Sequence, residues 1–254
     1  MTRVTEGFRG EGANVTAAVA AFLLLAMALA LPLRRADAQV GHDPSSSPFR
    51  DITTRQSITF TGGWFFGNEA KAGVGAQAAP SYGVKLRSAL SGPMDLLVNA
   101  AYVPSQRRTI DATAPESTRV GGPIPLNMVI VDLSIGLTLT GNKTWNGLAP
   151  YLTGGIGLVM PTETHVDPGG FKAGSGFTFA GAIGLRARMT RNLGLQFEAR
   201  DNTIRYEWPL SYFNPKDNAG NAITPPVLNP VGNKQTQTTH NFTLSAGLSW
   251  NFNF

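Results

Sequence analysis

Cysteine is absent from this 254-residue chain, and charge is sparse. Without thiols the protein can form neither disulfide bonds nor zinc–thiolate sites, and it has no thiol nucleophile. Charged residues make up 15% of the sequence, with 21 basic and 16 acidic side chains and a formal net charge of +5. The basic residues are spread out and form no run, so the composition argues against nucleic acid as a partner.

Residues suited to catalysis or metal binding are also scarce. The sequence has three histidines: His42, His165 and His240. Two residues after His240 stands Phe242 and not a serine, so strand spacing offers no nucleophile–base pair. A constellation of His240 with the distant Ser211 or Asp201 stays open. Residues 217–221 resemble part of a calcium loop but lack its distal glutamate. We therefore predict a non-enzymatic protein with no catalytic residue, no metal site and no cofactor.

A long uncharged and largely apolar run, Val15–Leu33, lies close to the N-terminus. Two arginines precede it, and the small-residue pattern Ala36-x-Ala38 follows it, as in secretory signal peptides. We predict a signal peptide over residues 1–38, cleaved after Ala38. An uncleaved transmembrane helix is the alternative, because about 20 apolar residues can cross a bilayer.

Residues 39–54 follow the cleavage site and contain several serines and prolines without a hydrophobic period. We interpret them as a flexible periplasmic leader. The remaining residues, 55–254, form one predicted domain.

An alternation of apolar and polar residues runs through that domain. In Phe242–Phe254, every even position is apolar or aromatic and every odd position is Thr, Ser, Gly or Asn. Side chains alternate between the two faces of a strand, so this segment has one apolar and one polar face. Seven further segments share the pattern, although Phe65 interrupts it in the first: 55–67, 81–90, 95–103, 127–140, 150–160, 175–189 and 193–202.

Strand and loop lengths point to a membrane barrel. Ten residues at ~3.3 Å each, tilted by ~40°, rise about 25 Å, the height of an outer-membrane apolar band. The connections alternate between short turns (91–94, 141–147, 190–192) and longer loops (68–80, 104–126, 161–174, 203–235). We predict an all-β, eight-stranded antiparallel up-and-down transmembrane β-barrel, with both chain ends facing the periplasm. A soluble lipocalin-like barrel, with its apolar face inward, is the alternative.

The barrel region resembles the small eight-stranded outer-membrane proteins, the OmpA-like and OmpW-like transmembrane barrels. Its terminal strand resembles the signal read by the barrel-assembly machinery, with Leu248, Trp250, Phe252 and Phe254 in step. The resemblance implies a porin-like monomer in a Gram-negative-type outer membrane, with membrane lipid and, during biogenesis, the assembly machinery as partners. It implies little about activity, because one fold carries many functions.

The charged residues of the predicted strands fall on the polar, inward parity: Lys85, Arg87, Asp132, Arg186, Arg188, Glu198 and Arg200. An eight-stranded barrel is just wide enough for side chains to fill, and a buried charge needs a partner. We expect a packed lumen network, with Arg186 and Arg188 beside Gln196 and Glu198 across a short turn. A narrow ion-selective path past the arginines is the alternative.

Aromatic residues cluster near the predicted strand ends: Trp64, Phe66, Tyr82, Tyr102, Trp250 and Phe252. Aromatic rings favour the boundary between lipid and water, so we interpret these residues as a girdle. A ligand-stacking role is the alternative.

The predicted function is that of a non-enzymatic integral outer-membrane barrel with a plugged polar lumen. Its loops, chiefly residues 203–235 and 104–126, would be available for contacts. The alternatives are a narrow channel for small or hydrophobic solutes and, less favoured, a lipid A-modifying enzyme.

Overall fold

A computed structural model describes residues 47–217 and 219–253. The predicted signal peptide with its cleavage site, residues 39–46 of the predicted leader, and Phe254 of the predicted assembly signal lie outside these residues. Within the described part of the chain, no helix is long and apolar enough to cross a bilayer. A single 3-10 turn is present there, η2 (Leu210–Tyr212).

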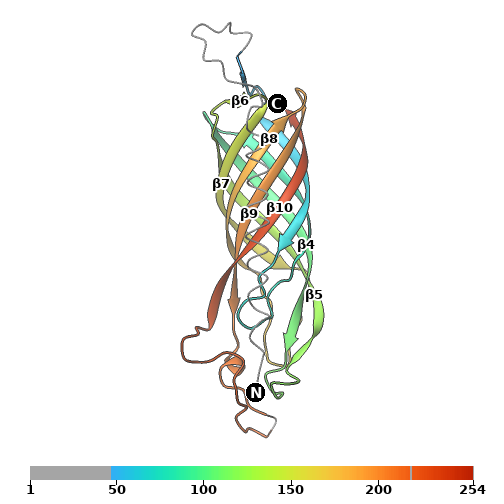
Figure 1. Cartoon of the computed structure of the whole chain (residues 1–254), viewed down its shortest axis with the longest axis vertical. Helices are drawn as coiled ribbons and strands as arrows, with labels where there is room; N and C mark the ends of the chain where they lie inside the picture. Colours follow the sequence, from blue (N-terminus) through green and yellow to red (C-terminus); the bar gives the residue numbers. More distant parts are fainter. Residues whose placement is uncertain (1–46, 218, 254) are drawn as a thin grey trace, which may run out of the picture.

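Eight long antiparallel strands form a closed ring (Figure 1). The ring consists of β2 (Gln56–Phe66), β3 (Ala79–Ala89), β4 (Met94–Ile110), β5 (Val120–Thr138), β7 (Leu148–Pro161), β8 (Gly176–Arg188), β9 (Leu193–Glu207) and β10 (Thr236–Phe252). Each strand pairs with the next of the eight, and β10 pairs back with β2 from Phe242↔Phe66 to Phe252↔Gln56. The predicted fold, an eight-stranded up-and-down barrel, is confirmed.

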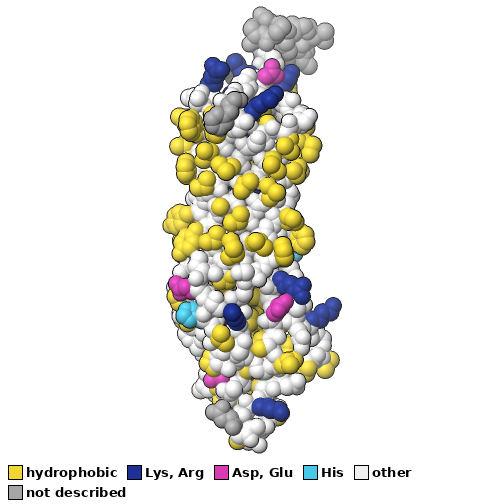
Figure 2. All heavy atoms as spheres, turned by 180° about the vertical axis from the view of Figure 1, so that it is seen from behind, with side chains coloured by type: hydrophobic (Ala, Val, Ile, Leu, Met, Phe, Trp, Pro, Cys, Tyr) yellow, Lys and Arg dark blue, Asp and Glu magenta, His cyan; other side chains and the backbone are white. Residues whose placement is uncertain are grey.

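The alternation along each strand separates an apolar outer surface from a polar interior. On β10, Leu248 is 52% exposed and Trp250 55%, whereas Ser249 between them is buried. Corresponding outward residues on the other strands include Phe60, Leu133, Ile156 and Ile183, all of them exposed. On the face seen in Figure 2, hydrophobic side chains gather in a belt across the barrel. Such a belt is what a lipid-facing wall requires and what a soluble wall avoids.

Beyond the belt, at the end with the long loops, the polarity of the two faces is reversed: the inward side chains become apolar and the outward ones polar. On β9 the inward row passes from Glu198 and Arg200 to Ile204 and Tyr206, while outward Arg205 is exposed to solvent. The faces of the strand stay the same, so the reversal marks the point where the strand leaves the apolar surroundings of the belt.

The inward apolar residues at this loop end form a hydrophobic core inside the barrel mouth. Its buried members are Phe65, Ala72, Val74, Ala76, Ala79, Val103, Ile110, Ala112, Leu126, Met128, Ile130, Val159, Phe171, Ile204, Tyr206, Trp208, Tyr212, Phe213 and Leu228. Phe65, which interrupts the alternation in the sequence, points inward and is fully buried here. Phe65 therefore breaks the alternation because the interior of the barrel is apolar at this level.

Strands β4 and β5 extend further than the sequence predicts. The expected loop over residues 104–126 is wrong, because the pairing continues through Gln106↔Pro125 and Arg108↔Pro123 to Ile110↔Val120. The prolines and arginines of this stretch resemble loop composition because the hairpin extends to the loop end of the barrel (Figure 1). Only residues 111–119 connect the two strands.

The chain before β2 is bonded to the end of the barrel that carries the short turns. β1 (Phe49–Asp51) pairs with β6 (Lys143–Trp145), which lies in the turn between β5 and β7. The Ile52 N–H donates to the carbonyl of Asn142 at 2.8 Å. The sequence predicts a flexible leader here, but its described part, from Ser47, forms a short sheet with the turn end.

Candidate functional site: the barrel lumen and its two ends

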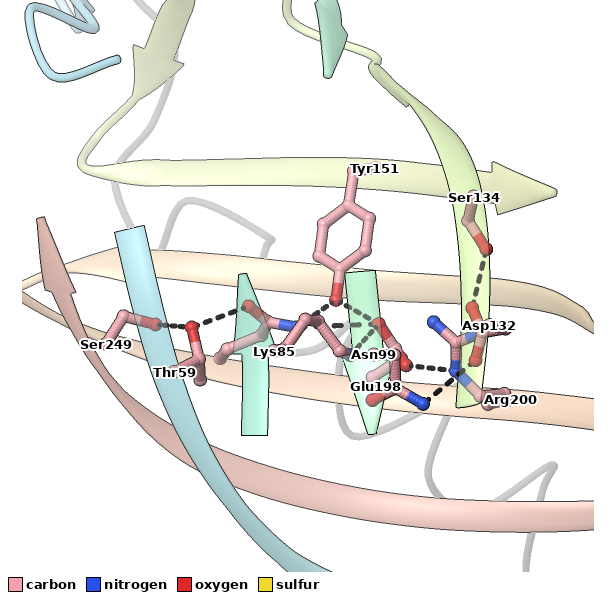
Figure 3. A network of polar contacts seen from close by, with 10 residues as sticks. Thr59, Lys85, Asn99, Asp132, Ser134, Tyr151, Glu198, Arg200 and Ser249 are labelled. Atoms are coloured by element: carbon pink, nitrogen blue, oxygen red, sulfur yellow. Dashed lines mark hydrogen bonds and ion pairs between the residues drawn. The ribbon is translucent and has the colours of Figure 1, made fainter. Parts of the chain in front are cut away.

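A network of charged residues crosses the middle of the lumen (Figure 3). Lys85 Nζ of β3 lies 2.6 Å from Glu198 Oε2 of β9. Arg200 of β9 bridges the two acids, with Nε 2.8 Å from Glu198 Oε1 and Nη1 2.9 Å from Asp132 Oδ1 of β5. All four side chains are at most 5% exposed. Two positive and two negative charges thus neutralise each other out of contact with bulk water.

Neutral donors complete the coordination of both carboxylates. The Tyr151 hydroxyl donates to Glu198 Oε2 at 2.7 Å. Asp132 accepts from Asn99 Nδ2 at 2.9 Å and from the Ser134 hydroxyl at 2.7 Å. Buried ion pairs offset their desolvation cost only when such additional hydrogen bonds are made. Both carboxylates are thus fully engaged, while Arg200 Nη2 is buried without a hydrogen-bond partner among the described residues.

Tyr151 of β7 points into the lumen beside the central network (Figure 3). Its ring is fully buried, its hydroxyl accepts from Gln196 Nε2 at 2.7 Å, and the guanidinium of Arg186 lies over its face at 4.1 Å. Gly184 stands opposite it in the register of β7 and β8. A Cβ at Gly184 would overlap the tyrosine ring, so the glycine makes room for this buried side chain.

A second polar layer lies nearer the turn end. Arg87 Nη1 contacts Asp95 Oδ1 at 2.9 Å, and Arg186 Nη1 contacts Asp95 Oδ2 at 2.8 Å. Asp95 was missing from the predicted lumen set because it stands next to a turn. Its inward parity, shared with Asn99, was the available signal. Arg188 donates only to neutral oxygens, among them the Asp51 carbonyl at 3.3 Å.

The expected partners of two arginines need correction. Arg186 does lie opposite Gln196, but Glu198 lies opposite Gly184, and Arg188 opposite Gly194. Glu198 is instead bound by Lys85, which reaches it from the other side of the ring. Pairing across a single hairpin was the wrong guide, because a closed barrel also brings side chains together across its interior.

The interior of the loop end is packed differently. Arg107 and Asp167 form a bidentate ion pair, at 2.8 Å (Nη1–Oδ2) and 2.6 Å (Nη2–Oδ1), with both side chains 1% exposed. The Arg107 guanidinium lies 5.1 Å from the centre of the Phe171 ring. Phe171 also contacts Trp208, with ring centres 5.5 Å apart. Sequence reasoning missed this cluster, because its loop members are far apart in the chain and follow no period.

Little space remains between the central network and the loop-end core. A cavity of about 20 Å³ lies there, lined by Lys85, Asn99, Arg200 and Asn202 among others. A single water needs roughly 10–15 Å³ by this kind of measure, so the cavity has room for one or two waters. At the turn end, by contrast, two pockets of about 50 and 340 Å³ are both lined by Ile52, Thr54 and Arg87.

The aromatic girdle candidates divide between the two ends of the belt. Trp64, Phe66, Tyr82 and Tyr102 lie toward the loop end, whereas Trp250 and Phe252 lie toward the turn end with ring centres 5.5 Å apart. Of these, Trp64, Tyr82, Tyr102 and Trp250 are among the exposed large side chains. Two separated sets of rings fit the borders of a lipid layer.

The two histidines of the described chain, His165 and His240, have no catalytic partner among the described residues. His240 Nδ1 lies 2.6 Å from Asp201 Oδ2 on the outer surface at the loop end, and no hydrogen bond to a side-chain hydroxyl is found for this ring among the described residues. Ser211 instead donates to the carbonyl of Gly169. Residues 47–217 and 219–253 contain no cluster of three or more potential metal ligands.

No protein-family model matches the sequence, and no curated protein matches it. Among solved structures, the chain is similar to small outer-membrane barrels. Neisserial surface protein A shares 15% identity, with a TM-score of 0.46 over 81% of this chain and 98% of that one. OprG from Pseudomonas aeruginosa shares 12%, with a TM-score of 0.46 over 82% and 100%. Ail from Yersinia pestis shares 13%, with a TM-score of 0.32 over 77% and 97%. The eight-stranded ring itself is established by the strand pairing of this chain.

Proposed function

We propose that this protein is a non-enzymatic integral outer-membrane β-barrel whose lumen is plugged and whose loop end is available for contacts with the surroundings. The observation that carries the proposal is the charge-balanced network of Lys85, Glu198, Arg200 and Asp132 across the lumen, beneath a hydrophobic core at the loop end. The first layer stops ions and the second leaves no continuous aqueous path. The barrel thus serves as a membrane-embedded support.

The outer surface supports the membrane part of the proposal. In the belt the exposed residues are apolar and the interior is polar, the reverse of a soluble lipocalin-like barrel. An eight-stranded wall with short turns at one end and long loops at the other is typical of outer-membrane proteins. In this proposal the short turns face the periplasm, the predicted signal peptide directs export, and the β10 residues Leu248, Trp250 and Phe252 present the assembly signal.

Opening of the lumen would require several buried contacts to break. A conducting path would have to separate Lys85 from Glu198 and displace the ring of Tyr151. Separating the charges of a buried ion pair is unfavourable, because each charge then stays in the interior without compensation. The closed arrangement is therefore the stable one, and an open lumen would need a coordinated rearrangement.

Electrical recording on the refolded full chain in a planar bilayer tests the proposal. We expect no steady conductance from the wild-type protein. An open porin recorded in the same bilayer is the control that shows whether a conducting lumen would be detected. A steady wild-type conductance would contradict the plugged lumen and favour the narrow channel.

Lipid modification is the alternative that the His240–Asp201 pair raises, since it lies on the outer surface close to the belt. A nucleophilic hydroxyl bonded to His240 would be needed for acyl transfer, and the described hydrogen bonds contain none. We expect no fatty-acid release from lipid A by the refolded protein. Release that disappears in His240→Ala would overturn the non-enzymatic assignment.

A further inference from the structure

The charges of this protein are distributed unevenly along the barrel axis. Seven basic residues gather at the turn end: Arg50, Arg55, Arg87, Lys143, Arg186, Arg188 and Arg191. Two acidic residues of the described chain accompany them: Asp51 and Asp95. Figure 2 shows Lys and Arg side chains at this end, above the apolar belt.

The rest of the barrel shows no such excess. The four charges of the central network cancel. The described loop end carries equal numbers of basic residues (Lys71, Arg107, Arg108, Arg119, Lys172, Arg205, Lys216 and Lys234) and acidic residues (Glu69, Asp111, Glu116, Glu163, Asp167, Asp201, Glu207 and Asp217). The excess positive charge of the described residues therefore resides at the turn end.

Three of these arginines line the turn-end mouth of the lumen, and two of them share the carboxylate of Asp95. The two oxygens of Asp95 are occupied by Arg87 and Arg186. Among the described residues, Arg188 contacts only neutral acceptors, the carbonyls of Asp51 and Arg191 and the hydroxyl of Thr53, at 3.3–3.4 Å. Three positive charges against one negative charge leave the mouth without local neutrality, and a confined site of this kind attracts anions.

Arg186 has hydrogen-bonding capacity left over. Its Nε and Nη2 are buried and have no hydrogen-bond partner within the described chain, and the side chain as a whole is 18% exposed. Unsatisfied buried donors of a charged group are costly, and an anionic acceptor would relieve that cost. The imbalance of charge and the unused donors thus occur at the same arginine.

The mouth also contains space. The pocket of about 50 Å³ is lined by Arg87, Arg186 and Arg188 together with the side chains of Ser57 and Asn251. The guanidinium group presents its N–H donors in a planar fork that matches the oxygens of a phosphate or carboxylate. Basic charge, polar side chains and a pocket of suitable size therefore converge at one place.

We propose that the turn-end mouth is a binding site for a small soluble oxyanion, a phosphate or carboxylate, held by Arg87, Arg186 and Arg188. The central network closes the lumen just beyond it, so the site binds its ligand without passing it on. The site goes beyond the proposed support function and does not require the protein to conduct.

Titration of the refolded full chain in zwitterionic detergent with inorganic phosphate, followed through the arginine side-chain NMR signals, tests this inference. We expect saturable shifts of a few arginine signals. Arg188→Gln should weaken phosphate binding at least about tenfold, because a charge-assisted bidentate contact is lost. Arg188→Lys keeps the charge but loses the planar guanidinium group. Its affinity for phosphate should lie between those of the wild type and Arg188→Gln. Arg188 is partly exposed, so these variants should fold.

Matched controls separate the site from general attraction of anions. Arg205→Gln removes an exposed arginine at the loop end and should leave phosphate binding unchanged. Acetate should compete with phosphate, whereas choline chloride at equal ionic strength should not. Three results would overturn the proposal: shifts that do not saturate, an equal loss in Arg205→Gln, or binding of short-chain phosphatidylglycerol without binding of phosphate. The last result would assign the arginines to lipid headgroups.

Discussion

The middle and the loop end of this barrel are built from the same strands, but their interiors are filled with side chains of opposite polarity. In the middle, outward residues such as Leu248 are apolar and the interior is held by ion pairs. At the loop end, outward residues such as Arg205 are charged and the interior is a hydrophobic core containing Phe171 and Trp208. The surroundings of the barrel determine whether the outward side chains are apolar or polar. In each region the inward side chains have the opposite polarity.

The two interiors differ in how they would respond to change. A hydrophobic core loses stability in proportion to the contacts removed. A charge network responds to the loss of one member more sharply, because the remaining charges stay buried without compensation.

Glu198→Gln should produce the largest effect. Lys85 and Arg200 would keep their charges in the dry lumen while losing their shared carboxylate. We expect a loss of about 3–5 kcal/mol in the free energy of unfolding, measured by urea titration of the protein refolded into lipid vesicles. Glu207→Gln, an exposed acid on the same strand, is the control and should change little. Equal stability of the two variants would remove the distinction between the regions.

Phe171→Ala should have the next largest effect, confined to the loop end. The ring packs against Trp208, Tyr206 and Tyr212 and beneath Arg107. Removing a buried aromatic side chain costs about 3 kcal/mol. We expect faster proteolysis within residues 161–175, with the heat-modifiable gel mobility of the barrel retained. Loss of that mobility would mean that the core at the mouth also holds the membrane part together.

Leu248→Arg tests the outer surface of the belt. A cation facing lipid should destabilise the barrel by about 2 kcal/mol, the lower end of the range known for barrel midplanes. The measurement is the same urea titration in vesicles. A neutral outcome would indicate that this face is in contact with water, contrary to the proposed membrane location.

Arg205→Leu makes the converse change on the outer surface beyond the belt and should have the smallest effect. Arg205 forms only an exposed contact with Glu207 at 3.8 Å, and surface ion pairs contribute about 0–1 kcal/mol. We expect a change within roughly 0.5 kcal/mol in the urea titration. A large loss of stability would mean that Arg205 supports a loop or the membrane boundary. The outer surface at the loop end would then be as sensitive to substitution as the belt.

Prediction from the sequence succeeded where the signal is local. All eight strands and the inward parity of Lys85, Asp132, Glu198 and Arg200 follow from a period of two residues. It failed where the environment changes along a strand. The hairpin of β4 and β5 beyond Val103 has the composition of a loop, because the alternation there no longer separates lipid from lumen.

The sequence alone determined the number of strands, their faces and the alternation of short and long connections. Successive side chains point to opposite faces of a strand, so the polarity of each face can be read directly from neighbouring residues. Only the tertiary structure decided which charges meet. Lys85 binds Glu198, Arg87 and Arg186 share Asp95, and Arg188 is left without a carboxylate among the described residues. Those partners depend on the closure and stagger of the ring, which bring distant strands together across the lumen, and no local pattern encodes such a distance.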